Sequence, residues 1–154
     1  MADRMLVRKA IEVEHYPVAS ATVIEIGDAL YYDGTANQVF PLGDWTWNTD
    51  LATTQAEVDA IFAGISMSRS AAGDTDDVRV ATKGEAEFDC DSASFNPDEF
   101  VGPDENATPD ALENQKAVTV ASAALAFGKP SKVQASVTKV FFVFRSAITG
   151  PRID

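Results

Sequence analysis

The residues that most often carry out catalysis are scarce in this chain of 154 residues. It contains one histidine, His15, and one cysteine, Cys90, far apart along the sequence. A catalytic serine would need the histidine as its base, but the Gly-x-Ser-x-Gly motif is absent and His15 lies in a charged N-terminal segment. A lone cysteine most often packs as a small apolar side chain. Nucleophilic catalysis and a disulfide framework are therefore not favoured.

Carboxylates are abundant, with 24 Asp and Glu against 12 Lys and Arg. Glycoside hydrolysis needs two carboxyls at a defined separation, one of them with a raised pKa in an apolar cleft. No pair stands out among so many acids, and most lie in polar stretches where they should simply ionise. The sequence therefore gives no specific signal for acid–base catalysis.

A calcium site is the best metal candidate and has a weak motif. The stretch "DCDSASFNPDEF" from Asp89 has Asp at its first and third positions, as an EF-hand loop has. Ser94 stands where that loop needs Gly, and Phe100 where it needs Glu. The acids at residues 74–77 could hold an ion, but a solvated turn is the more common arrangement. Glycines are isolated, so no phosphate-binding loop is present. We predict no metal ion and no cofactor.

Two tryptophans suggest a binding surface. Trp45 and Trp47 alternate with polar residues, which places both indoles on one face of an extended segment. Together with Tyr31 and Tyr32 they could form a platform for a carbohydrate. Packing in the core or at a subunit interface is the commoner role of such rings. Both alternatives remain open from the sequence.

The net charge of −12 argues against a nucleic-acid partner. The charge is unevenly distributed, with a net of −16 over residues 28–114 and +5 over residues 115–154. The simpler interpretation is a solvated acidic surface. The alternative is that oppositely charged faces orient the protein on a partner or on copies of itself.

Hydropathy predicts neither a membrane span nor a secretion signal. No window approaches the roughly 18 consecutive apolar residues of a membrane-spanning helix. The N-terminus lacks a long apolar stretch before a small-residue cleavage site. We expect the protein to be made in a reducing, cytoplasm-like compartment, without a membrane partner.

The first part of the chain, residues 1–17, is predicted to be an extended N-terminal arm. Val7, Ile11 and Val13 occupy odd positions among charged residues, which is typical of a strand. Its partner could be the protein's own sheet or another chain. Because so short a segment is not expected to bury its apolar side chains in a compact body, we expect it to be mobile in the free protein.

Residues 18–154 are predicted to form a single β domain. Asp33-Gly34 is a strong turn signal between two short apolar runs, which predicts a hairpin. Thr54 and Glu57 form a capping-box motif that predicts a helix over 54–62. Residues 78–90 alternate with a period of two, as does an antiparallel strand with one wet face.

The second half of the domain is expected to contain a long loop and a final strand. Residues 91–114 hold three prolines and many acids, which predicts a long acidic surface loop. The run around Phe141–Phe144 is apolar on both faces, so it should be a central strand or an edge covered by another subunit. The sum is an all-β fold, a mainly antiparallel small barrel or sandwich with one short helix.

Several segments occur in a familiar order between about residues 18 and 145. They are "VIEIGDALYYDG", "FAGIS", "VRVATKGEAEF", "AFG" and "VTKVFFVF". This order of strands and turns resembles the small capsid decoration proteins of tailed bacteriophages. The chain departs from their pattern in its "WTWN" segment and in residues 91–114.

The resemblance implies a β-tulip-like fold without enzymatic activity. It also implies a virion protein, made in the host cytoplasm, that binds the major capsid protein on the outer capsid surface as a homotrimer. A carbohydrate-binding or adhesin-like module is the alternative, and an enzyme is third. The residues expected at a capsid or subunit interface are Met5, Leu6, Val7, Ile11, Val13, Trp45, Trp47, Phe141, Phe142 and Phe144.

Overall fold

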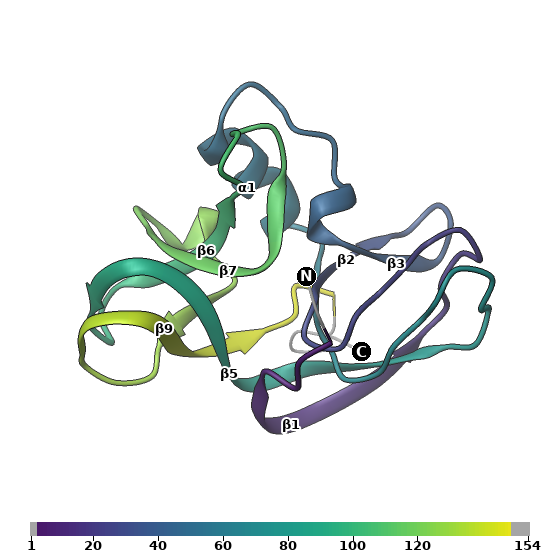
Figure 1. The fold of residues 1–154 in the computed structure, drawn as a ribbon, viewed down its shortest axis with the longest axis horizontal. Helices are drawn as coiled ribbons and strands as arrows, with labels where there is room; N and C mark the ends of the chain where they lie inside the picture. Colours follow the sequence, from purple (N-terminus) through teal and green to yellow (C-terminus); the bar gives the residue numbers. More distant parts are fainter. Residues whose placement is uncertain (1–2, 149–154) are drawn as a thin grey trace, which may run out of the picture.

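The computed structural model describes residues 3–148 and confirms the all-β class with one short α-helix. Its strands form one continuous sheet in the order β3-β2-β4-β5-β7-β6-β8-β9, with β1 paired to β5 (Figure 1). The elements are β1 (Val7–Tyr16), β2 (Ala29–Asp33), β3 (Gln38–Pro41), a 3-10 turn (Leu42–Asp44), α1 (Leu51–Asp59), β4 (Phe62–Ser66), β5 (Val78–Phe95), β6 (Phe100–Glu105), β7 (Leu112–Val120), a second 3-10 turn (Ala123–Leu125), β8 (Gly128–Pro130) and β9 (Gln134–Arg145).

Five of the strands close into a barrel. β9 pairs with both β8 and β5, so the path β5-β7-β6-β8-β9 returns to its start. The barrel occupies the left of Figure 1, with α1 above it and the β2–β3 hairpin on the other side of the molecule. Every strand pair except β5–β7 is antiparallel. The barrel alternative and the mainly antiparallel arrangement are both confirmed.

The 18-residue strand β5 connects the two parts of the fold. Its first part pairs with β1 along one edge and with β4 along the other. Its later part belongs to the barrel. Residues 78–90 alternate between inward and outward positions as predicted, because buried apolar side chains line one face.

Of the two partners considered for the N-terminal strand, the structure has the protein's own sheet, so the predicted free arm is wrong for the described residues. β1 pairs with β5 from Val7 opposite Ala86 to Tyr16 opposite Val78. Leu6 and Val7 are buried in the main core. Gly84 permits this pairing, since a Cβ at that position would collide with the backbone oxygen of Lys9. Residues 1–2 of the expected arm, and 149–154 of the expected domain, lie outside the described residues.

The predicted loop over 91–114 is also wrong. β5 continues to Phe95, β6 lies wholly within the same range, and β7 begins in it at Leu112. Phe95, Val101 and Leu112 are buried, and they supply the inward positions that the abundant acids conceal in the sequence. Only the short connections around Pro97 and Pro109 are irregular.

The helix begins and ends earlier than predicted. Asp50 caps it by accepting a hydrogen bond from the backbone N–H of Thr53 at 2.8 Å. Thr54 and Glu57 therefore do not form the predicted capping box. Glu57 instead accepts hydrogen bonds from side chains in the tryptophan segment.

The apolar side chains divide into two clusters. The larger fills the barrel, where the rings of Phe88, Phe127 and Phe142 contact one another with centroids 5.1–5.9 Å apart. The smaller lies between the β2–β3 hairpin and the start of β5 and includes Leu30 and Val80. β9 pairs with a strand on each side and is therefore central. This confirms the first of the two alternatives for the run around Phe141–Phe144, a central strand rather than a covered edge.

Candidate functional site: a basic groove on the outer sheet face

Four adjacent strands, β1, β5, β9 and β8, bring charged side chains into one row. Lys9 lies opposite Glu85, Glu85 opposite Val143, and Val143 opposite Lys129. Residues opposite one another in register share a face of the sheet, and here the face is outward. Lys83 opposite Arg145 forms the neighbouring row. The sheet thus gathers cations from segments that are distant in the sequence.

These rows surround a hollow of about 450 Å³, which we call the basic groove. Its apolar lining includes two side chains that are unusually open to solvent, Ile11 at 56% exposed and Val143 at 45%. A pocket of this size with aliphatic side chains and convergent charges is typical of a binding surface. The groove is lined by Lys9, Ile11, Lys83, Gly84, Glu85, Phe127, Gly128, Lys129, Val143, Phe144 and Arg145.

The four cations of the groove form no ion pair within residues 3–148. Elsewhere in the described chain most cations are paired, for example Arg8 with Glu87 at 2.8 Å and Lys116 with Asp91 at 3.1 Å. In a protein with a net charge of −12, unpaired cations would be expected to find acids easily. Four cations without an ion pair in the described chain therefore surround one apolar hollow.

A second hollow, of about 460 Å³, lies further along the same outer face of β5 and β9. Phe141 and Lys139 line it, and the Lys132 ammonium lies 4.3 Å from the centroid of the Phe141 ring. The adjoining Val133 is 70% exposed. Of the predicted basic 115–154 region, Arg152 lies outside the described residues and Lys116 lies apart from both hollows. The others lie on this face, namely Lys129, Lys132, Lys139 and Arg145.

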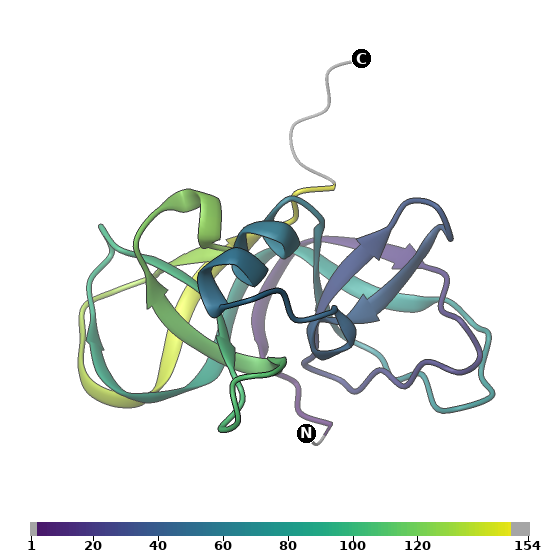
Figure 2. The ribbon, with the colours of Figure 1, turned by 90° about the horizontal axis from the view of Figure 1, so that it is seen from above.

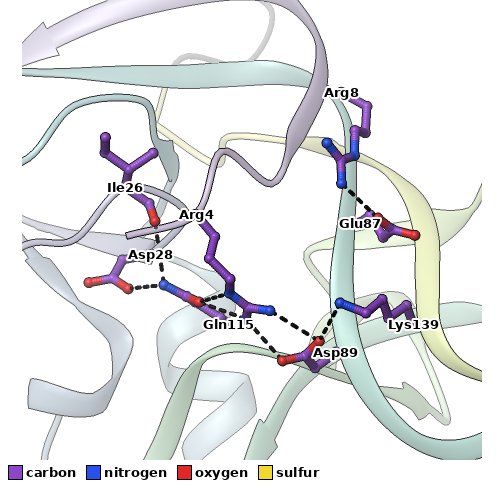
Figure 3. Close-up of polar contacts among 8 residues, drawn as sticks. All are labelled: Arg4, Arg8, Ile26, Asp28, Glu87, Asp89, Gln115 and Lys139. Carbon is purple, nitrogen blue, oxygen red and sulfur yellow. Dashed lines mark hydrogen bonds and ion pairs between the residues drawn. The ribbon is translucent and has the colours of Figure 1, made fainter. Parts of the chain in front are cut away.

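Arg4 ties the N-terminal segment, and with it one wall of the groove, to the barrel. Its guanidinium donates to both carboxylate oxygens of Asp89, at 2.9 and 3.3 Å, and to the side-chain oxygen of Gln115 at 2.7 Å (Figure 3). These hydrogen bonds lower the pKa of Asp89. Lys139 approaches the same carboxylate at 3.6 Å. Arg4 therefore fixes the chain just before β1.

A buried polar pair continues this network. Gln115 is fully buried and donates to the Asp28 carboxylate at 2.9 Å. The other oxygen of Asp28 accepts the backbone N–H of Glu25 at 3.0 Å. Burial raises the pKa of Asp28, because removal from water disfavours its charged form. Sequence analysis missed this network, since its members lie on separate segments and no local motif joins them.

The tryptophan segment forms a shallow hollow of about 290 Å³ beside α1. Trp45 and Trp47 are both partly buried against the main core. The Trp45 indole N–H donates to Glu57 at 3.0 Å. Tyr31 packs against Trp45, whereas Tyr32 packs against Tyr16 in the smaller cluster. The predicted four-ring platform is therefore not assembled, although the two indoles remain together.

The predicted interface residues fall into three groups. Four are buried inside the chain, which corrects the expectation that they are exposed, although Phe144 also lines the basic groove: Leu6, Val7, Phe142 and Phe144. Three are exposed: Met5, Ile11 and Val13. Three are partly buried: Trp45, Trp47 and Phe141. Ile11 lines the basic groove and Phe141 the second hollow.

The residues considered for catalysis do not converge. His15 is exposed on β1, whereas Cys90 is buried in β5. No group of three or more His, Cys, Asp and Glu side chains suited to a metal ion occurs within the described residues. Burial raises the pKa of Asp28, Asp44 and Asp59, and none of these three lines the basic groove or the second hollow.

Comparison with protein-family models finds no match, and no curated protein sequence matches the chain. Over the part of the chain that the structure covers, no helix has the length and hydropathy needed to span a membrane.

Proposed function

We propose that this protein is a non-enzymatic virion component that decorates a bacteriophage capsid. It binds the major capsid protein on the outer capsid surface, as a homotrimer, and stabilises the lattice after synthesis in the host cytoplasm. The resemblance described above supports this proposal. The observation that carries it is the outer face of β5 and β9, where exposed apolar side chains lie among cations in an otherwise acidic protein.

Such a face is suited to contact with another protein rather than to chemistry. Apolar side chains contribute binding free energy as they leave water, and surrounding charges select and orient the partner. A protein that binds only the assembled lattice stabilises it by mass action, by about 2.7 kcal/mol per site at a hundredfold excess over Kd. Repetition over many equivalent sites makes modest individual binding sufficient.

Co-sedimentation with capsids tests the proposal. The variant Val133→Asp places a charge on a 70% exposed aliphatic side chain in the connection between β8 and β9, next to Lys132 and Gln134 of the second hollow. The matched control, Ala107→Asp, adds the same charge to the exposed connection between β6 and β7. We expect the control to bind as the unmodified protein does and Val133→Asp to lose most binding. Failure of the unmodified protein to co-sediment would contradict the proposal.

The hollow beside α1 favours a second candidate, a carbohydrate-binding module. Trp45 and Trp47 offer partly open indole faces, and Asn48 and Glu57 supply polar groups next to them. Sugars commonly bind such combinations of aromatic faces and hydrogen-bonding side chains. Titration with oligosaccharides, followed by tryptophan fluorescence, tests it. A saturable change that Trp47→Ala abolishes would favour this candidate over decoration.

A further inference from the structure

We infer that the basic groove binds an acidic loop, residues 70–77, of a second copy of this chain. This loop and the uncharged loop of residues 19–24 lie side by side at one end of the molecule, and together they are called the acidic apex here (Figures 1 and 2). Ile24 and Ser70 exchange backbone hydrogen bonds of 2.9 Å, and Gly73 donates to Ser20 at 2.6 Å. This inference rests on the homotrimer of the proposed function and assigns the basic groove and the acidic apex as the two surfaces in contact.

The cations of the groove have no ion-pair partner in the described chain, although the Lys129 ammonium lies 5.2 Å from the centroid of the Phe100 ring. Lys9, Lys129 and Arg145 are exposed and Lys83 is partly buried, and none has an ion pair in the described chain. Among residues 3–148, Glu85 is the only acid that lines the hollow. Ile11 and Val143 are open to solvent within this ring of cations. The complementary ligand is an acidic segment that carries an aliphatic side chain.

The acidic apex has that chemistry. Asp74, Asp76 and Asp77 are all exposed and, within the described residues, form no ion pair. Val23, on the adjoining loop, is 46% exposed. The groove volume of about 450 Å³ lies within the ~300–1,000 Å³ of typical ligand pockets and leaves room for such a side chain.

A contact between these surfaces must join different copies. The apex precedes β5, and the groove lies over its middle, so about 20 Å of regular strand separates Asp77 from Lys83 at ~3.3 Å per residue. One chain therefore does not fold its own apex into its own groove. Because the two surfaces differ, the contact is heterologous, and such contacts generate closed rings where the rotation between copies permits. A homotrimer is one such ring.

Charge reversal tests the contact in the absence of capsids, so its failure is distinguishable from a failure of capsid binding. The groove variant combines Lys9→Asp with Lys129→Asp, and the apex variant combines Asp76→Lys with Asp77→Lys. All four positions are exposed, so the fold should persist, and circular dichroism checks that it does. The solution mass of each variant is measured by light scattering, together with that of a combined variant carrying all four changes.

We expect the unmodified protein to have the mass of three chains and to dissociate as salt screens the contact. Either reversal alone should reduce the mass to the 16.5 kDa of one chain, and the combined variant should regain the larger mass. A monomeric unmodified protein would overturn the inference. So would an oligomer that survives both reversals, or a combined variant that stays monomeric.

Discussion

Replacement of Leu6 by alanine tests whether the N-terminal segment is part of the folded body. Leu6 precedes β1, is only 5% exposed and packs in the main core. Its side chain packs against Gly27: a Cβ added to that glycine would lie 3.1 Å from the Leu6 Cγ. Truncation would leave a cavity that the backbone on both sides cannot easily fill.

The expected loss is the usual one for a buried leucine. Leu→Ala changes in cores lower the free energy of unfolding by about 2–5 kcal/mol. For a domain of about this length, each kcal/mol corresponds to roughly 2–4 °C in Tm. A loss of about 3 kcal/mol therefore predicts a fall in Tm of roughly 6–12 °C. Thermal unfolding followed by circular dichroism measures this directly.

Val13→Ala is the matched control, because Val13 lies on β1 but is 39% exposed. We expect its effect on the free energy of unfolding to stay within about 0.5 kcal/mol. Equal and negligible effects of the two substitutions would refute the reasoning. They would restore the mobile arm that the sequence suggests.

Three further predictions concern β5. Arg4→Ala should lower stability by about 1 kcal/mol at neutral pH. Because the lowered pKa of Asp89 stabilises the fold only while that carboxyl is ionised, urea titrations should show the difference shrink as the pH falls below about 4, to the part that the hydrogen bonds from Arg4 to Gln115 contribute. The Cys90 thiol, buried and with a raised pKa, should react with a thiol reagent at pH 8 only after unfolding, and immediate reaction of the native protein would contradict its burial. Gly84→Ala should lower the urea midpoint by the equivalent of about 1–3 kcal/mol, since its Cβ meets the backbone of Lys9, and an unchanged midpoint would mean that β1 is not held there.

Local patterns predicted the parts of the fold that local interactions determine. The period-two alternation of β5 survives in the structure, because one face of that strand is buried and the other is wet. The turn at Asp33-Gly34 joins β2 and β3 as expected. These features depend on neighbours along the chain, so composition and spacing reveal them.

Long-range pairing decided the parts that sequence analysis missed. Whether β1 joins its own sheet depends on an open edge of β5, some 70 residues away, and on the absence of a side chain at Gly84. The many acids of 91–114 mask the end of β5, all of β6 and the start of β7, because the few buried residues there are spaced by bulges and prolines. The uneven charge anticipated a basic face, but the groove needs Lys9 and Lys83, which lie outside the basic C-terminal region.

Capsid melting tests the central claim most directly. Phage capsids, the partner that the proposed function names, are heated with and without saturating protein, at low and at high salt. The proposal predicts a higher melting temperature in the presence of the protein. If the basic face mediates attachment, added salt should reduce the increase, because it screens exposed charges. Identical melting with and without the bound protein would contradict a stabilising role.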